Sequence, residues 1–316
     1  MKGIFYNKSA LLHLGVLLYF ILIGLLINTL LGHLVFSISE SEPENIYSFS
    51  FYEMHAIQFV SVIFLFIIPA IGTAYFCSKK PREYLHLYKI KSLKVIVLCI
   101  LMTLFLSPVI DITAYLNSKM HLPEFMEPVE NWMRYSEDKV AELTNMLLSE
   151  KGLTPFISNI IVIGVMAGVS EELLFRGALT SIIEKKIKNH HIVIWFVAII
   201  FSAIHMQFFG FIPRMLLGAY LGYLLYWSGS IWVPIFAHFL NNTIAIIGYK
   251  MDLFQLSSDN FTFISEDMEA GELYTILALA TIGLILFFLC VKIMKATRSS
   301  TADNNKENPP SANDKD

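Results

Sequence analysis

The stretch TPFISNIIVIGVMAGVSEELLFRGALT, residues 154–180, is apolar over a membrane-spanning length and yet contains charged side chains. A helix needs about 20 consecutive apolar residues to cross the hydrocarbon core of a bilayer. The ionisable residues of this run are Glu171, Glu172 and Arg176. An ionisable side chain at membrane depth costs at least about 2.5 kcal/mol, so such residues indicate pairing or function. The stretch therefore predicts a transmembrane helix that carries a buried polar site.

The whole chain shares this apolar character. Of its 316 residues, 55% are hydrophobic and 16% are charged, a balance outside the usual range of soluble domains. The runs 192–206 and 211–227 are short and close together, which predicts a tight helical hairpin or a partly re-entrant pair. We expect an all-α, polytopic membrane helical bundle of about eight transmembrane helices, formed by 154–180 and by the apolar runs 10–36, 56–77, 92–116, 192–206, 211–227, 231–250 and 272–293.

The charges between the runs predict the orientation. Basic residues follow the second, fourth and eighth runs, whereas acidic residues follow the first and the seventh. Because positively charged loops stay in the cytoplasm, this pattern places both termini there. The net charge is −3, and no basic stripe that could follow a phosphate backbone occurs, so we expect no nucleic acid partner. The basic residues are Lys79, Lys80, Arg82, Lys89, Lys91 and Lys94, then Lys185, Lys186 and Lys188, then Lys295 and Arg298.

Two segments fall outside the spans. Residues 122–152 are too polar to cross the membrane but have apolar residues at helical spacing, which predicts an amphipathic helix at the outer interface. The tail 297–316 is rich in Ser, Asn, Asp, Lys and Pro, which predicts disorder. We therefore divide the chain into an integral membrane helical domain, 1–296, whose motif-bearing core is about 154–250, and a disordered cytoplasmic tail, 297–316.

Helical geometry separates the two adjacent glutamates. Glu172 and Arg176 are four residues apart, so they share one face and can form an ion pair. Glu171 points about 100° away from Glu172. Glu171 therefore lacks a partner in its own helix and is the better candidate for a catalytic base. A purely structural ion pair between Glu172 and Arg176 is the simpler alternative for those two residues.

Two other runs carry polar residues at the same spacing. His205 follows Phe201 by four residues, and Asn242 follows His238 by four. A carboxylate, two imidazoles and a carboxamide could together hydrolyse an amide bond, because a glutamate can take a proton from water while His or Asn stabilises the developing oxyanion. Alternatively, the imidazoles and a carboxylate could bind Zn²⁺ and leave a position open for water. The chain has no HExxH motif, so a metal site would be assembled from separate helices.

The three motifs resemble those of the CPBP family, which comprises CAAX prenyl proteases and bacteriocin-processing enzymes related to the Abi proteins. That family has a paired-glutamate motif with Arg four residues after the second Glu, then Phe-x-x-x-His, then His-x-x-x-Asn. All three occur here in that order, within residues 162–247. The resemblance implies an intramembrane endopeptidase, either glutamate-dependent or a metalloprotease, that acts on membrane-embedded, lipid-anchored or prenylated-type peptides in the lipid bilayer. It also implies a multi-pass protein of the plasma membrane.

The resemblance further implies a role for each matching residue. Glu171 would activate water, Glu172 and Arg176 would support the site, and His205, His238 and Asn242 would position water, bind metal or stabilise the oxyanion. If Zn²⁺ is present, its ligands would be Glu171, His205 and His238.

Two other functions fit the same residues. One is a non-catalytic membrane protein that confers immunity by binding a bacteriocin or another peptide. The other is a proton-coupled transporter, against which the lack of an internal repeat argues. Among the remaining polar residues, Asp111 is expected to serve helix packing or to lie at a span end, and His190 and His191 are expected to be solvated in a cytoplasmic loop.

Overall fold

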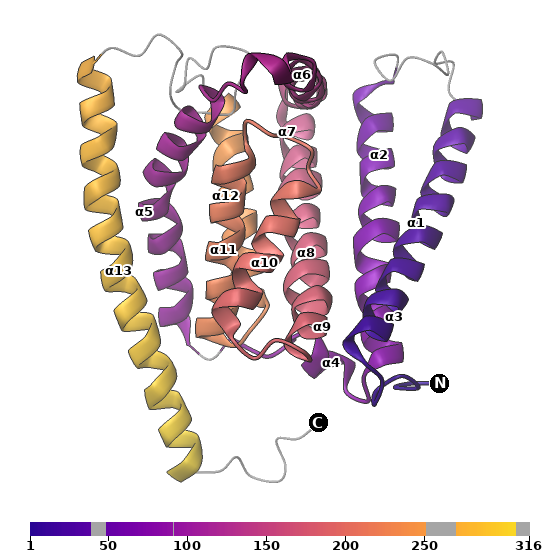
Figure 1. The fold of residues 1–316 in the computed structure, drawn as a ribbon, viewed down its shortest axis with the longest axis vertical. Helices are drawn as coiled ribbons and strands as arrows, with labels where there is room; N and C mark the ends of the chain where they lie inside the picture. Colours follow the sequence, from indigo (N-terminus) through magenta and orange to yellow (C-terminus); the bar gives the residue numbers. More distant parts are fainter. Residues whose placement is uncertain (39–48, 91, 251–269, 308–316) are drawn as a thin grey trace.

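The computed structural model describes residues 1–38, 49–90, 92–250 and 270–307 (Figure 1). Within these ranges the protein is all-helical, as the apolar runs predict, and no strand occurs. The acidic residues that follow the first and seventh runs, residues 39–48 and 251–269, lie outside the described residues, as do Lys91 and the last part of the tail, 308–316.

Within the described ranges, five helical segments are long and apolar enough to cross a membrane. They are residues 10–34, 51–77, 93–118, 153–184 and 273–297. The first is formed by α1 (Ala10–Ile38), the third by α5 (Leu93–Ser118) and the fifth by α13 (Ala270–Glu307). The second joins α2 (Phe51–Val62) through a π-helical turn to α3 (Ile68–Cys77). These segments confirm a multi-pass helical membrane protein.

The segment 153–184 that carries the paired glutamates is continuous but irregular. It contains α7 (Leu153–Asn159), α8 (Ala167–Glu172) and α9 (Thr180–Glu184), joined by the π-helical stretches Ile160–Met166 and Leu173–Leu179. π-Helical turns inside helices occur frequently at functional sites.

Three further apolar helices complete the set of eight. They are α10 (His190–Ala203), α11 (Phe211–Ser228) and α12 (Trp232–Lys250). α10 has 14 residues and is shorter than a full span, while α11 and α12, with 18 and 19 residues, carry polar residues that lower their apolar character. α10 and α11 pack against each other as the predicted hairpin.

The boundaries of α10 correct two expectations. The helix ends at Ala203, so His205 lies beyond it rather than within a span that reaches residue 206. It also begins at His190, which stacks on Tyr226 with ring centroids 3.9 Å apart. His190 is therefore half-buried rather than solvated, whereas its neighbour His191 is exposed.

The helices form a bundle whose polar site lies at the centre. In Figure 1, α13 and α5 lie side by side at one edge, α1 and α2 stand at the other, and α8, α10, α11 and α12 lie between them. The short α4 (Pro81–Tyr84) and α9 are at the lower end, where α1 begins and α13 ends. α13 continues to Glu307, so the first part of the expected tail is helical.

The predicted amphipathic helix is α6 (Glu127–Ser149), which follows a short 3₁₀ turn at Glu124–Met126. Figure 1 shows α6 nearly end-on at the upper end of the bundle, so it crosses the direction of the spans. This orientation agrees with the position at an interface, which stays a prediction.

The close contact of α1 with the neighbouring helix depends on Gly24. A Cβ atom at Gly24 of α1 would lie 2.1 Å from the carbonyl oxygen of Phe64. The replacement Gly24→Ala should therefore push α1 from its neighbour and lower the free energy of unfolding by about 1–3 kcal/mol, as overpacking does. Gly15 is the matched control, since a Cβ there meets nothing within 4 Å. Thermal unfolding in detergent should separate Gly24→Ala from Gly15→Ala; equal shifts would contradict this packing.

Candidate active site

Glu172 and Arg176 form the predicted ion pair at the centre of the site. Arg176 Nη1 donates to Glu172 Oε1 at 2.9 Å, and the two side chains are 1% and 0% exposed. Arg176 Nη2 donates to the carbonyl oxygen of Gly218 on α11 at 2.7 Å. The guanidinium also lies over the ring of Phe201, 4.7 Å from its centroid. The pair therefore ties the glutamate segment to both helices of the α10–α11 hairpin.

Arg176 keeps one nitrogen unpaired. Its Nε has no hydrogen-bond partner among the described residues. The residue lines a cavity of about 270 Å³, together with His86, Thr180 and Glu184. A cavity of this size has room for several water molecules.

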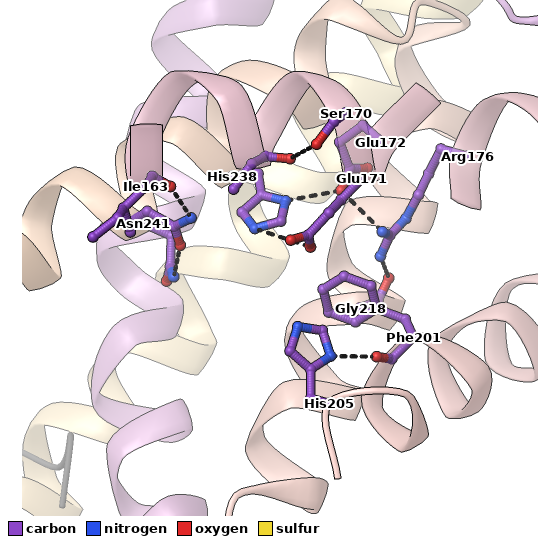
Figure 2. A network of polar contacts seen from close by, with 12 residues as sticks. Ile163, Ser170, Glu171, Glu172, Arg176, Phe201, His205, Gly218, His238 and Asn241 are labelled. Atoms are coloured by element: carbon purple, nitrogen blue, oxygen red, sulfur yellow. Dashed lines mark hydrogen bonds and ion pairs between the residues drawn. The ribbon is translucent and has the colours of Figure 1, made fainter. Parts of the chain in front are cut away.

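His238 of α12 joins the two glutamates (Figure 2). Its Nδ1 lies 3.0 Å from Glu172 Oε1, and its Nε2 lies 3.9 Å from Glu171 Oε2. Because a carboxylate only accepts, Nδ1 carries the proton of this hydrogen bond. The 3.9 Å separation is too long for a direct hydrogen bond but suits a bridging water. Glu172 therefore orients His238 while the other ring nitrogen faces Glu171.

Glu171 is the freer carboxylate, as its place on the helix predicts. Its Oε2 is buried and has no hydrogen-bond partner among the described residues. The side chain of Glu171 is 17% exposed, whereas that of Glu172 is fully buried. Glu171 therefore has an acceptor atom available for water or substrate.

His205 lies close to the site, but its ring is bonded to the last turn of α10. Its Nδ1 donates to the carbonyl oxygen of Phe201 at 2.7 Å, since a carbonyl can only accept. In the neutral imidazole this leaves Nε2 as an acceptor. The ring of Phe201 contacts both imidazoles, with centroids 5.1 Å from His205 and 6.0 Å from His238. Figure 2 shows His205 apart from the cluster formed by the glutamates and His238.

Asn242 shares a face of α12 with His238, as the spacing predicts. Both residues point to the glutamate segment, since Asn242 Nδ2 donates to the carbonyl oxygen of Ile163 at 2.9 Å. Asn241 Nδ2 lies 3.4 Å from Asn242 Oδ1. One hydrogen of the Asn242 amide thus remains available to a ligand. Asn241 did not stand out in the sequence, because it lies outside the four-residue spacing.

The predicted zinc ligands are not brought together in this arrangement. Among the described residues, no three His, Cys, Asp or Glu side chains are grouped closely enough to hold a metal ion. Glu171 and His238 face each other, but His205 is bonded to Phe201 instead of turning to them. As these side chains lie, they do not fit a three-ligand metal centre.

The turn that follows α10, residues 204–210, is held by α6. Glu137 Oε2 accepts a hydrogen bond from the backbone N–H of Phe209 at 2.9 Å. The ring of Trp132 packs on that of Phe208, with ring centroids 5.2 Å apart. Burial raises the pKa of Glu137, an effect that the Phe209 N–H partly offsets. These contacts fix the turn that carries His205.

Two more residues of α6 and α5 strengthen this contact. Arg134 lies over the ring of Phe209, 4.3 Å from its centroid. Hydrogen bonds from Arg134 hold the pKa of Glu130 at about 2, so this α6 pair stays ionised at neutral pH. Asn117 of α5 donates to the carbonyl oxygen of Phe208 at 3.1 Å. Such tertiary contacts leave no periodic signal in the sequence.

Arg214 is a further polar residue of this region that the sequence analysis missed. It lies in the predicted run 211–227, so the criterion that selected Glu171, an ionisable residue at membrane depth, could have found it. Its Nη2 donates to Gln207 Oε1 at 2.6 Å, two residues after His205.

Comparison with known families supports the assignment of the motifs. Residues 153–244, which contain all three motifs, match the family described as type II CAAX prenyl endopeptidase, Rce1-like. This part of the chain is therefore similar to the Rce1-like family. The resemblance to CAAX prenyl proteases is thereby confirmed. The match ends two residues after Asn242 and leaves the first three spans outside.

A curated relative covers a region of the same size. The chain is 30% identical over 92 residues to the uncharacterized protein YpbD of Bacillus subtilis (strain 168), an alignment that covers 28% of this chain and 44% of the relative. The chain thus spans less than half the length of that relative. No solved structure matches the chain.

Proposed function

We propose that this protein is an intramembrane endopeptidase in which Glu171 activates the water that attacks the peptide bond. The observation that carries the proposal is the pair of facing acceptors, Glu171 Oε2 without a partner and His238 Nε2 at 3.9 Å from it. A water molecule between these two atoms donates one hydrogen bond to each of them. The lone pairs of the water oxygen can then attack the carbonyl carbon of a peptide bond. The proposal extends the Rce1-like match of residues 153–244 to activity.

The hydrolysis then proceeds in two proton transfers. Glu171 takes a proton from the water as its oxygen bonds to the carbonyl carbon of the substrate. The tetrahedral oxyanion needs a donor, and the free hydrogen of the Asn242 amide is suited to this role. When the C–N bond breaks, protonated Glu171 returns the proton to the departing amine. Glu172 and Arg176 act through His238, because Glu172 fixes the proton on its Nδ1.

Cleavage of peptides in a bilayer tests this proposal. The purified protein, reconstituted in nanodiscs, would be mixed with membrane-associated peptides with and without a prenyl group on a cysteine, and new termini would be read by mass spectrometry. We expect cleavage at one peptide bond of at least one class, and the comparison identifies the class. Tight binding of intact peptides without any new terminus would instead support the immunity function.

Metal dependence is tested on the same samples. Zinc on Glu171, His205 and His238 would be the second hypothesis, and it requires His205 to release Phe201. Under our proposal, we expect cleavage to persist after prolonged treatment with a chelator. Metal analysis of the treated protein establishes that the metal has been removed. Loss of cleavage that zinc alone restores would replace the glutamate mechanism with a metalloprotease mechanism.

We also propose a plasma-membrane location with both termini cytoplasmic. The beginning of α1 and the end of α13 lie at the same end of the bundle, where the basic loops after α3 and α9 also lie (Figure 1). A cysteine introduced near residue 2 should be labelled by a membrane-impermeant thiol reagent in inverted vesicles and not in intact cells. Labelling in intact cells would reverse the orientation.

A further inference from the structure

Arg214 occupies a defined place beside the candidate active site. It lies in the first turn of α11, four residues before Gly218, so the two residues share a face of that helix. The backbone carbonyl oxygen of Gly218 accepts from Arg176. Arg214 therefore lies one turn before that contact and next to the turn that carries His205, and it interacts electrostatically with Glu171.

The guanidinium of Arg214 is held by neutral acceptors. Nη2 donates to Gln207 Oε1 at 2.6 Å, and Nη1 lies 3.5 Å from the carbonyl oxygens of both Gln207 and Gly210. A Cβ atom at Gly210 would lie 3.3 Å from Nη2 and 3.5 Å from Nη1, so the glycine leaves room for the guanidinium. The turn 207–210 thus forms a cradle that fixes the position of this cation.

No anion within the described residues neutralises Arg214 directly. None of their carboxylates lies within 4.0 Å of its guanidinium. Glu137 and Glu171 interact with it electrostatically from farther away, and Glu137 already accepts from Phe209. The side chain is half-buried, and arginine does not lose its proton in proteins. Burial of a charge is costly without a counter-charge, so a partly desolvated, fixed cation of this kind is suited to an anionic ligand.

We propose that Arg214 binds a carboxylate of the peptide substrate and thereby selects where the chain is cut. The proposal rests on the peptidase function above. A carboxylate matches the planar guanidinium and can be bound by two parallel hydrogen bonds. It comes either from the free C-terminus of the peptide or from an acidic side chain near the cleaved bond. In both cases Arg214 holds the substrate segment beside Glu171, and the bond that is cleaved is a peptide bond of the substrate and not the bound carboxylate.

Equilibrium binding separates this proposal from the proposed function. Three peptides that share one sequence apart from the last residue would be compared: one with a free C-terminal carboxylate, one with a C-terminal amide, and one C-terminal amide whose last residue is glutamate. Binding is measured with the Glu171→Gln protein, so the peptides stay intact whether or not the wild type cleaves them. We expect at least one carboxylate peptide to bind about 10-fold to 100-fold tighter than the plain amide.

The variant Arg214→Gln in the same background should remove that preference and leave binding of the plain amide unchanged. The peptide that loses affinity identifies the source of the carboxylate. Arg134 is the matched control, because it lies against the same turn but is paired with Glu130 at 2.7 Å. The variant Arg134→Gln should keep the preference.

Two results would overturn the proposal. One is equal binding of all three peptides before Arg214 is changed. The other is an equal loss for acid and amide peptides in Arg214→Gln, which would show a structural role. If the wild type cleaves peptides, KM should rise about 10-fold to 100-fold in Arg214→Gln for the preferred peptide only, with kcat unchanged. A fall in kcat on every peptide would point to the oxyanion instead.

Discussion

The change Glu171→Gln is expected to lower kcat for peptide cleavage by about 10²-fold to 10⁴-fold, the range typical of a lost general base. Glutamine has the shape of glutamate but cannot take a proton from water. The fold should be unaffected, because Glu171 Oε2 has no hydrogen-bond partner among the described residues that the change could break. Single-turnover cleavage and thermal unfolding of the same preparation measure both quantities.

Glu184 provides the matched control for this experiment. It lies at the end of the same helical segment, in α9, outside the cluster of His238 and the two motif glutamates. The change Glu184→Gln should leave kcat within about twofold of the wild-type value, because Glu184 takes no part in the proton transfers. An active Glu171→Gln enzyme would remove Glu171 from the role of base.

Loss of Arg176 should have the largest effect on stability. In Arg176→Met, Glu172 would remain as a fully buried carboxylate whose one remaining side-chain partner among the described residues is His238. Breaking a buried ion pair on one side costs about 3–5 kcal/mol, because a charge is left without compensation. We therefore expect a large fall in the free energy of unfolding, measured by thermal or denaturant unfolding in detergent.

Two further variants isolate the buried charge as the cause. The double change Glu172→Gln with Arg176→Met removes both charges and should recover part of the lost stability. The exposed pair of Lys139 and Glu142, 3.2 Å apart, is the control, since Lys139→Met should cost at most about 1 kcal/mol. If Arg176→Met and Lys139→Met were equally mild, the buried pair would not be what ties the segment to α11.

The local part of the site follows from the sequence alone. A four-residue spacing places two side chains on one helix face whatever surrounds the helix, so the pairing of Glu172 with Arg176 and the shared face of His238 and Asn242 were predictable. The same rule leaves Glu171 without a partner in its helix. The all-helical class followed equally directly, because only a helix satisfies the backbone of a long apolar run within a bilayer.

The rest depends on how helices meet, which the spacing of residues does not encode. His205 lies beyond the end of α10 and is turned toward Phe201 by a backbone hydrogen bond, so its motif spacing did not place it with the glutamates. The contact of Glu137 with Phe209 joins residues 72 positions apart. Arg214 was visible as a charge in an apolar run, but its cradle depends on Gly210 and the turn before α11.

The most direct test of peptide hydrolysis is cleavage of a membrane peptide in water enriched with ¹⁸O, analysed by mass spectrometry alongside the Glu171→Gln protein. The account predicts one ¹⁸O atom in the new carboxyl terminus made by the wild type and almost no product from the variant. Peptide that stays intact with both proteins, although it binds to both, would contradict catalysis.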